Sequence, residues 1–494
     1  MLFVGLILLA FGSLMVYGVV LLKMKRRRYK HLPMPPLSSF IGGHFPVIKE
    51  ATKQDGHMFN LYLKWTENYG LIWCRFLFWK AGVVVLSVDG IKDMFITNGG
   101  LYKVQKSSLT YFGGQRFTGY GGLLNNVGGD VWRRKRHALD PAFHKKYLQS
   151  LIPKMNEMTR AMIEQLKQNT NANDFIDMDW YMKKSAILLI ASIGYGIDLN
   201  NREDVSMEQI LDSMNDMMDG FFGEAFDPLF LHNPMNRHLT RKTKEAGCLL
   251  RRLGHDALKH RRDQIKQNLE TPVDLLAHSI RIQENSPWYS DEEVVDDFVT
   301  FIVAGFETTS NVMSFVLALL ARNPGVSAWA AQEMTDLVEG KQFLDEDDLS
   351  EMSYLECVIK EAMRLYPVVS LVRRSTNVDS IIDKHLIPTD TQVMFLPFLQ
   401  GRLEEIWSEP LSFKPERFLK TESLKKFTYI PFLVGPRKCI GSTFAMNEIK
   451  IVVGQILQHF ELSAPSDEDI EPEFRITLGP KVGTRLRLRE RATS

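Results

Sequence analysis

The chain has 494 residues, of which 45% are hydrophobic and 24% are charged, and a chain of this length can bury a large core. This composition excludes intrinsic disorder and a small disulfide-stapled scaffold. Because 60 basic side chains balance 59 acidic ones, for a net charge of +1, no global positive field favours nucleic acid as a partner. The four cysteines lie far apart and form no C-x-x-C pair, so the sequence indicates neither a disulfide framework nor a zinc site.

The N-terminal segment is long and apolar enough to cross a membrane. Residues 1–22 contain no charged side chain, and a helix of this length spans about 33 Å. Basic residues crowd the next segment, residues 23–30, so the positive-inside rule predicts a cytosolic location for the rest of the chain. We therefore expect a single-pass transmembrane signal-anchor. The alternative, a cleaved secretory signal, lacks a basic n-region and a small-residue cleavage site.

A short hinge follows the expected anchor. Residues 23–36 combine the basic side chains with Pro33, Pro35 and Pro36, which stop a helix and favour an extended connector. No internal repeat or long Gly/Ser linker interrupts residues 37–494. We therefore expect one catalytic domain in that range.

Helical patterns dominate residues 37–494, and strand-like runs are short. The runs cover residues 71–78 and 83–88 and then, much later in the chain, residues 369–372 and 393–396. We therefore predict a mainly α-helical fold with a small β-sheet, whose strands come from distant parts of the chain.

The longest helix is expected to begin after Ser290 and to end at Asn323 and Pro324. Ser290 with Glu293 three residues later is the pattern of a capping box. A helix of about 32 residues is about 48 Å long, enough to cross a whole domain. Gly305 in its middle destabilises a helix by about 1 kcal/mol relative to alanine, so we expect another group close to the backbone there. Helix packing and a cofactor both fit this expectation.

One cysteine near the C-terminus lies between glycines. Residues 432–441 read FLVGPRKCIG, and a helical pattern follows them. The Cys439 thiol lies beside Arg437 and Lys438 and just before a helix, a setting that favours the thiolate and hence metal ligation. For a cysteine considered alone, an inert buried thiol is the common alternative.

The spacing F-x-x-G-x-R-x-C-x-G, matched here at every fixed position, resembles the haem-binding loop of the cytochrome P450 family. The resemblance implies that Cys439 is the axial thiolate ligand of haem b, iron protoporphyrin IX. It further implies that Phe432 packs by the thiolate and that Arg437 meets a haem propionate. A thiolate ligand favours cleavage of the O–O bond. The resemblance covers essentially the whole chain and implies the cytochrome P450 fold.

Two further motifs resemble a structural lock of the family. Glu361 and Arg364 form an E-x-x-R pattern on one helical face, and Arg417 lies in the run FKPERF at residues 413–418. An isolated pair of this spacing is usually a solvated surface bridge. The resemblance instead implies a buried Glu361–Arg364–Arg417 cluster that supports the haem loop and has no catalytic role.

Other basic residues resemble those that hold the haem propionates. Trp132 and Arg136 match the family pattern W-x-x-x-R; a nuclear-targeting signal is the alternative interpretation of this basic run. Arg374 is a further propionate candidate by its position. The neighbouring Arg373 leaves the choice between these two arginines open.

The middle of the long helix resembles the distal motif [AG]-G-x-[DE]-T-[TS] of the family, because residues 304–309 read AGFETT. The resemblance implies that Ala304 and Gly305 leave room beside the haem for O2 and substrate. It also implies that Thr308 hydrogen-bonds the reacting oxygen and that Glu307 relays protons. The expected reaction is monooxygenation, in which one atom of O2 enters a C–H bond and the other becomes water.

Electrons have to come from a partner protein. The sequence contains no dinucleotide fingerprint and no Walker motif, so the chain is not expected to take electrons from NADPH itself. The resemblance and the anchor point to NADPH-cytochrome P450 reductase at the endoplasmic reticulum membrane. A basic patch of Arg133, Arg134, Lys135 and Lys438 is the candidate docking surface. A generic solvated face is the alternative.

The substrate is expected to be an apolar lipid. The Gly-rich segment 112–124, where family members line the substrate pocket, resembles the sterol side-chain hydroxylases of the family less well than other segments do. A second segment carries soft and bulky side chains that suit a lid over an apolar ligand, although plain core packing explains them equally well. These side chains are Met214, Met217, Met218, Phe221, Phe222, Phe226, Leu229, Phe230 and Leu231.

Three segments, residues 28–33, 297–301 and 427–432, resemble the sterol side-chain hydroxylases of the family. We therefore expect sterol hydroxylation, with a fatty acid or a xenobiotic as the alternative substrate. Two other classes remain open. A haem-thiolate isomerase would need no reductase, although such proteins often lack the distal threonine that is present here, and a haem sensor would bind gas without turnover.

Overall fold

The computed structural model describes residues 2–98, 122–124, 129–169, 174–226, 230–338, 341, 343–419 and 424–491. The chain forms two compact units. Unit 1 contains Met1–Gln105, Leu371–Ser408 and Lys425–Arg437, and unit 2 contains Lys106–Ser370, Glu409–Leu424 and Lys438–Ser494. The single catalytic domain expected over residues 37–494 stays a prediction.

Unit 1 is built around a four-stranded sheet in the order β1-β2-β7-β4. The strands are β1 (Ile72–Leu77), β2 (Lys80–Val85), β7 (Gln392–Phe395) and β4 (Val372–Ser375). The β2–β7 pair is parallel, and the β1–β2 and β4–β7 pairs are antiparallel. A small sheet made from distant segments is therefore confirmed for these strands.

Two of the predicted strand boundaries are wrong. The run expected over residues 83–88 ends at Val85, because Ser87 caps helix α4 (Val88–Lys92) by accepting a hydrogen bond from the Gly90 backbone N–H. The run expected over residues 369–372 begins only at its last residue and continues to Ser375. Pairing with the neighbouring strands, rather than the local run of apolar residues, sets where these strands begin and end.

One face of the sheet forms an apolar core with Phe76, Val83, Val393 and Phe395. Unit 1 also contains several further elements. They are α1 (Leu2–Arg27), α2 (Phe45–Asp55), α3 (Phe59–Tyr69), the π-helical turn η1 (Asp93–Thr97), β5 (Ser380–Ile382), β6 (His385–Ile387) and α16 (Pro397–Gln400).

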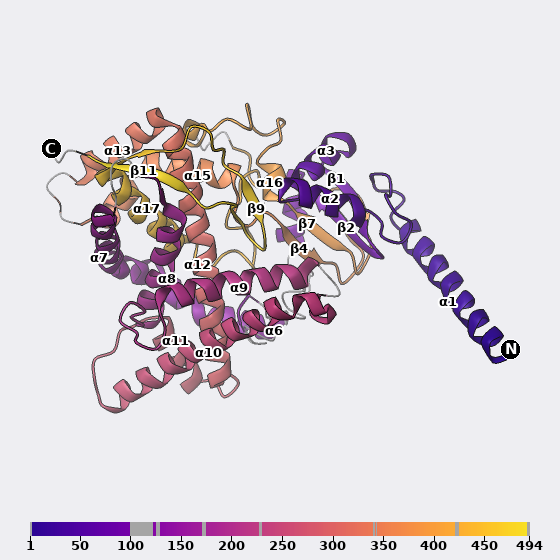
Figure 1. Cartoon of the computed structure of the whole chain (residues 1–494), viewed down its shortest axis with the longest axis horizontal. Coiled ribbons are helices and arrows are strands. Elements are labelled where there is room, and N and C mark those ends of the chain that lie inside the picture. The colour runs from indigo at the N-terminus through magenta and orange to yellow at the C-terminus, as the bar shows by residue number, and fades with distance from the viewer. Residues whose placement is uncertain are drawn as a thin grey trace. The chain divides into compact units, whose positions relative to one another are not determined.

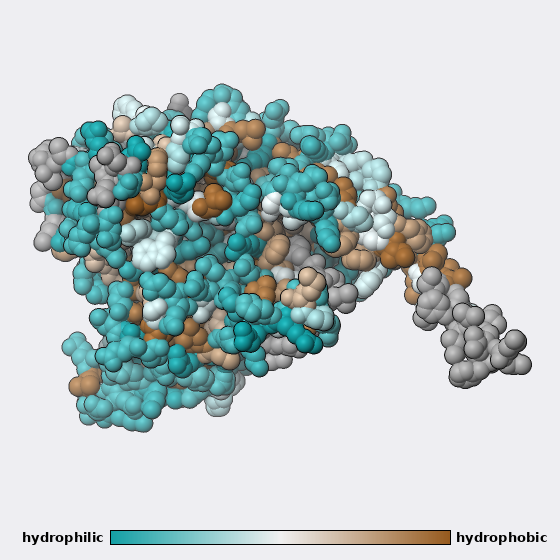
Figure 2. All heavy atoms as spheres, viewed as in Figure 1, coloured by the Kyte–Doolittle hydropathy of each residue, from teal (hydrophilic) through white to brown (hydrophobic). Residues whose placement is uncertain are grey.

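Helix α1 extends away from α2, α3 and the sheet (Figure 1). In its described part the apolar side chains Val16, Tyr17, Val20 and Met24 are exposed, and Figure 2 shows the apolar surface along this part of the helix. The side chains of residues 1–12, 14 and 15 lie outside the described part. The transmembrane anchor therefore stays a prediction.

Unit 2 is mainly helical. Its helices are α6 (Gly129–Leu139), α7 (Lys145–Asn169), α8 (Met178–Tyr195), α9 (Met207–Phe226), α10 (Arg237–Lys266), α11 (Leu275–Glu284), α12 (Asp291–Arg322), α13 (Pro324–Val338), α14 (Glu346–Glu351), α15 (Ser353–Leu365) and α17 (Ser442–His459). Its short 3-10 turns are η3 (Asp140–Phe143), η4 (Phe230–His232), η5 (Pro234–Asn236) and η6 (Pro415–Phe418).

The strands of unit 2 form two small sheets. One has the order β3-β11-β8, and the other is the β9–β10 hairpin. Their bounds are β3 (Ile176–Asp177), β11 (Arg485–Glu490), β8 (Phe460–Ser463), β9 (Pro472–Phe474) and β10 (Leu478–Pro480).

Helix α12 is the central element of unit 2 and confirms the predicted long helix, because it covers Asp291–Arg322, 32 residues. It packs against α8, α15 and α17 (Figure 1). Among the described residues it is the one helix long and apolar enough to cross a membrane, but 78% of its apolar window is buried inside the protein. Burial by the surrounding helices explains its apolar composition.

Only half of the predicted capping box forms at the start of α12. The Ser290 hydroxyl accepts the Glu293 backbone N–H, but the Glu293 carboxylate pairs with the Lys135 ammonium group. A β-carbon on Gly305 would lie 3.2 Å from the Ile190 side chain of α8. Helix packing therefore accounts for this glycine.

Helix α9 places four of the nine proposed lid side chains in the core. Met214, Met217, Met218 and Phe221 are buried, and α9 packs along α10. A β-carbon on Gly220 would lie 2.1 Å from the Thr243 hydroxyl oxygen of α10. The core-packing alternative therefore fits these residues, while the Phe226 side chain, Leu229 and residues 112–121 lie outside the described part.

Candidate active site

The loop that leads to the cysteine depends on a glycine. Gly435 has a φ angle of +79°, and a β-carbon there would lie 2.3 Å from the Phe95 carbonyl oxygen. Any other residue would force the loop away from η1. Phe432 and Arg437 are half-buried in the same segment, and their contacts with a haem stay predictions.

Cys439 differs from the buried cysteines of the chain. Cys74 and Cys357 are buried, and burial raises their pKa to about 12 and about 11, whereas Cys439 is exposed. The surrounding protein atoms nevertheless desolvate the Cys439 thiol and raise its pKa. Together these observations place the thiol in a recess of the protein surface, two residues before Gly441 caps α17.

The expected stabilisation of the thiolate is only partly correct. The Gly441 backbone N–H and the charge of Arg136 both lower the pKa of Cys439, but desolvation by burial outweighs them. A bound metal ion would remove the thiol proton outright, so the recess suits a ligand that itself carries the positive charge.

Helix α6 brings the W-x-x-x-R motif to the cysteine. The Arg136 Nη1 donates to the Lys438 carbonyl oxygen at 3.0 Å, and its Nε donates to the Asp140 Oδ1 at 2.8 Å. Trp132 is buried on the same helix. Arg136 thus holds the peptide group next to Cys439, and its contact with a propionate stays a prediction.

The middle of α12 is open on one side. Val303, Ala304, Gly305, Glu307 and Thr308 are partly exposed. By contrast, most residues on either side of them along the helix are buried. The Thr308 hydroxyl donates to the Ala304 carbonyl at 2.7 Å. Small side chains beside this open stretch leave space for a ligand.

Glu307 is held by two residues that sequence reasoning missed. The Thr477 hydroxyl donates to Glu307 Oε1 at 2.8 Å, and the Asn311 amide donates to the same oxygen at 3.2 Å. Thr477 lies in the turn of the β9–β10 hairpin, 170 residues away in sequence. No local pattern could have indicated this contact.

A second carboxyl group lies behind the distal motif. Glu448 of α17 is buried and accepts a hydrogen bond from the Thr309 hydroxyl at 3.3 Å. Burial raises the pKa of Glu448 to about 8, so this group holds its proton at neutral pH. It too was absent from the sequence-based site.

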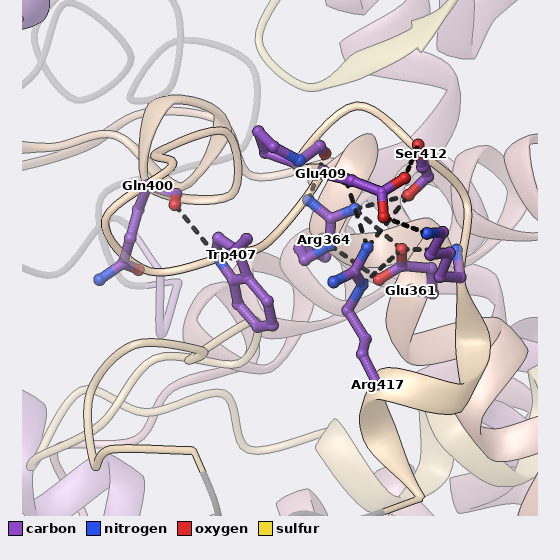
Figure 3. Close-up of polar contacts among 9 residues, drawn as sticks. Glu361, Arg364, Gln400, Trp407, Glu409, Ser412 and Arg417 are labelled. Carbon is purple, nitrogen blue, oxygen red and sulfur yellow. Dashed lines mark hydrogen bonds and ion pairs between the residues drawn. The ribbon is translucent and has the colours of Figure 1, made fainter.

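The Glu361–Arg364–Arg417 cluster forms as the sequence predicted (Figure 3). Arg364 donates to both Glu361 oxygens at 2.7 and 2.8 Å, and the Arg417 Nε donates at 2.9 Å. The remaining Arg364 groups donate to the Pro410 and Ser412 carbonyls. Both guanidinium groups pair with the one buried carboxylate of Glu361, and carbonyl oxygens accept further N–H groups of Arg364, which indicates a structural role.

Arg374 of β4 is a half-buried cation of a different kind. Its guanidinium lies over the Phe95 ring at 5.4 Å and bonds the Arg373 carbonyl. Burial lowers the pKa of Arg374 to about 10, so it stays charged at neutral pH. In the described part of the chain it forms no salt bridge. Phe95 also contacts Gly435 of the cysteine loop, which favours Arg374 over Arg373 as the propionate partner.

The predicted docking patch has to be corrected at one position. Lys135 is fully buried between Glu293 and Asp297, with 3.1 Å from its Nζ to the Asp297 carboxylate. The two carboxylates of α12 enclose the Lys135 ammonium group, so it cannot contact a partner protein. Arg133, Arg134 and Lys438 are exposed and remain available.

Taken one by one, these residues have a chemistry that suits a haem. The recessed Cys439 thiol can supply a metal ligand, the unmatched Arg374 charge can neutralise a propionate, and the open stretch of α12 leaves room for O2. The expected haem residues thus have a chemistry that suits the group. Ala304 borders the open stretch, whereas Gly305 is explained by helix packing.

Comparison with known proteins agrees with this chemistry. The cytochrome P450 family model matches residues 33–484. Similar proteins include cytochrome P450 4ae1 of Drosophila melanogaster, 28% identical over 87% of this chain and 88% of the relative. Cytochrome P450 3A13 of Mus musculus is 27% identical over 82% and 81% of the two chains. The chain belongs to the cytochrome P450 family and is a haem-dependent monooxygenase.

Proposed function

We propose that this cytochrome P450 hydroxylates the side chain of a sterol. The observation that carries the proposal is the similarity of residues 28–33, 297–301 and 427–432 to cholesterol 24-hydroxylase. Residues 297–301 lie on α12, just before the open stretch at Ala304. The segment therefore leads directly into the helix region where a substrate would meet the reacting oxygen.

The residues of α12 have separate roles in the proposed reaction. When bound, haem supplies the activation of O2, with Cys439 as its ligand. Thr308 orients the reacting oxygen and Glu307 delivers protons. The bonds from Thr477 and Asn311 hold the Glu307 carboxylate in one orientation, so proton delivery depends on the β9–β10 hairpin as well as on α12.

The electron donor in this proposal is NADPH-cytochrome P450 reductase. Arg133 and Arg134 of α6 and Lys438 next to Cys439 are exposed basic residues, and Arg136 of α6 bonds the Lys438 carbonyl. An exposed basic surface of this kind suits an acidic partner. We further propose that residues 1–22 anchor the chain in the endoplasmic reticulum membrane. The exposed apolar side chains of α1 support an anchor because water disfavours them.

A substrate panel tests the proposal. Full-length protein, reductase and NADPH are incubated in vesicles with sterols, fatty acids and neutral drug-like compounds, and products are identified by mass spectrometry. We expect a hydroxylated sterol side chain as the main product. A fatty-acid or xenobiotic product with no sterol product would replace the sterol assignment, and conversion without NADPH would indicate an isomerase.

The axial ligand has a matched control within the chain. Cys439→Ser should abolish the red-shifted Soret band of the reduced, carbon-monoxide-bound protein, because serine cannot supply a thiolate. Cys248→Ser alters the other exposed cysteine and should leave the band unchanged. Equal spectra for the two variants would overturn the assignment of Cys439.

The role of Thr308 is tested by coupling. Thr308→Ala should raise hydrogen peroxide release and lower product formed per NADPH several-fold, because the hydroxyl no longer orients the reacting oxygen. Thr335→Ala is the control, since the Thr335 hydroxyl makes the same kind of bond, to the Ala331 carbonyl of α13. Unchanged coupling in Thr308→Ala would contradict the role.

A further inference from the structure

The turn of the β9–β10 hairpin is tied to α12 by three polar side chains. Glu307 Oε1 accepts hydrogen bonds from the Thr477 hydroxyl at 2.8 Å and from the Asn311 amide at 3.2 Å. The same amide also donates to the Thr477 hydroxyl oxygen at 3.3 Å. These three groups form a closed triangle. The orientation of the Glu307 carboxylate therefore depends on where the turn places Thr477.

Strand β10 holds one side of this turn. A β-carbon on Gly479 would lie 3.1 Å from the Asn311 side-chain oxygen, so the strand approaches α12 closely where it has no side chain. The Leu478 backbone N–H donates to the Val368 carbonyl oxygen at 2.8 Å. Both contacts belong to β10, whereas the β9 side of the turn is attached to a different helix.

Helix α9 holds the β9 side of the turn. Arg475 directly follows β9, and its Nη1 lies 2.9 Å from Asp219 Oδ1 while its Nε donates to Glu473 at 2.9 Å. The Phe222 ring of α9 meets the Phe474 ring of β9 edge to face, with 6.3 Å between their centres. Asp219 and Phe222 share one helix face because they are three positions apart. This face of α9 therefore holds the turn by an ion pair and by an aromatic contact.

The charge of Arg475 also links α9 to the distal motif. Desolvation lowers the pKa of Arg475, but nearby carboxylates raise it by more. In decreasing order of Coulombic effect, these carboxylates are those of Asp219, Glu473 and Glu307. Arg475 therefore stays charged and is attracted both to α9 and to the carboxylate on α12.

We propose that Asp219 and Arg475 are positioning residues that couple helix α9 to proton delivery by Glu307. Through their ion pair α9 fixes the turn, and Thr477 in the turn then orients the Glu307 carboxylate. A change in the position of α9 therefore changes proton delivery. This inference rests on the proposed role of Glu307, and it assigns no chemical step to Asp219 or Arg475.

The ion pair can be removed without opening the core. The side chains of Asp219 and Arg475 are each 41% exposed, and pairs with this exposure contribute little to stability. Asp219→Asn and Arg475→Gln should therefore fold. Asp216→Asn is the matched control, because Asp216 lies on the same helix but pairs with Lys242 of α10 at 3.3 Å.

Hydrogen exchange measured by mass spectrometry tests the attachment without any turnover. Asp219→Asn should speed exchange in residues 472–480 at least 3-fold, because the β9 side of the turn loses a contact. Arg475→Gln should have the same effect, and the double variant should exceed neither. Asp219→Glu keeps the carboxylate and should keep the wild-type rate, as should Asp216→Asn. Equal exchange in the wild type and Asp219→Asn would overturn the proposal.

Turnover in H2O and D2O tests whether the turn acts on Glu307. Full-length haem protein, reductase and NADPH are used with the substrate that gives most product in the panel. If Glu307 delivers protons, Glu307→Gln should lower kcat at least 10-fold. Asp219→Asn should lower kcat about 2- to 5-fold and increase the solvent isotope effect, because a slower proton transfer limits the rate more. The KM of Asp219→Asn and the kcat of Asp216→Asn should match the wild type.

The outcomes separate the coupling from the proposed function. An unchanged kcat in Glu307→Gln would refute proton delivery by Glu307 and, with it, the coupling. A slower Glu307→Gln variant together with an unchanged Asp219→Asn variant would overturn only the coupling through α9. A lower kcat in Asp219→Asn with an unchanged isotope effect would also overturn it, because a loss of folded protein gives that result.

Discussion

The two units bury arginine in opposite ways. In unit 2, Glu361 pairs with both Arg364 and Arg417, and carbonyl oxygens accept further N–H groups of the two arginines. In unit 1, Arg374 is desolvated without a salt bridge among the described residues, and its contacts are an aromatic ring and a peptide oxygen.

This difference separates structural charges from binding charges. A buried ion whose partners are all protein groups contributes to the fold, and removing one partner leaves a costly unmatched charge. A buried cation without an anion is favourable only when something outside the chain supplies the negative charge. By this criterion the Glu361 cluster is structural, and Arg374 is predicted to bind an anionic group such as a haem propionate.

The largest expected effect comes from opening the matched cluster. Glu361→Ala leaves Arg364 and Arg417 without their carboxylate, so we expect a loss of about 3–5 kcal/mol in the free energy of unfolding. Denaturant titration measures it. The control Glu157→Ala removes an exposed pair with Lys154 and should cost less than about 1 kcal/mol. A similar small loss for both variants would end the distinction between the two kinds of arginine.

The next effect concerns the unmatched charge. Arg374→Gln should weaken haem binding by about 10-fold or more, as expected for the loss of a charged hydrogen bond, and should change the unfolding midpoint little. Haem transfer to an apo-globin acceptor measures the affinity. Arg373→Gln removes the same charge one residue earlier, on the other face of the sheet. It should leave haem affinity unchanged, and a larger effect of Arg373→Gln would reverse the assignment.

The smallest expected effect is a pH dependence at Lys135. Burial raises the pKa of Asp297 to about 6, and Lys135 limits this rise. A raised carboxyl pKa means that stability falls as pH rises through the folded pKa. Lys135→Met should raise the pKa of Asp297 further. The free energy of unfolding, measured by denaturant titration, should therefore differ more between the wild type and Lys135→Met at pH 7.5 than at pH 5.5.

A control for this effect is Lys154→Met, which removes an exposed lysine. Its difference from the wild type in free energy of unfolding should not depend on pH. The difference in free energy of unfolding between the wild type and Lys135→Met could instead be equal at both pH values. That result would show that Asp297 is already neutral or is matched by another group. In that case Lys135 would not belong with the matched charges.

Local sequence patterns predicted the elements that depend on short-range rules. The bounds of α12 follow from the Ser290 cap and from Asn323 and Pro324, because capping and helix termination act within one turn. The Glu361–Arg364 geometry follows from the i, i+3 spacing of a helix. The motif of the cysteine turn likewise spans ten positions, although Phe95 and Arg136, far away in sequence, also contact the turn.

The rest of the site could not be predicted from residues that are neighbours in the sequence. Nothing near Lys135 in sequence indicates that Glu293 and Asp297 bury it. The bond from Thr477 to Glu307 and the bond from Thr309 to Glu448 join residues more than 100 positions apart.

The sequence by itself therefore determined the helices, the haem-loop motif and the family, because these are encoded by spacings of a few residues. Only the tertiary structure decided which charges are matched, which of Arg373 and Arg374 faces the cysteine loop, and which acidic groups stand behind the distal motif. The physical reason is that desolvation and pairing depend on neighbours that only chain packing brings together.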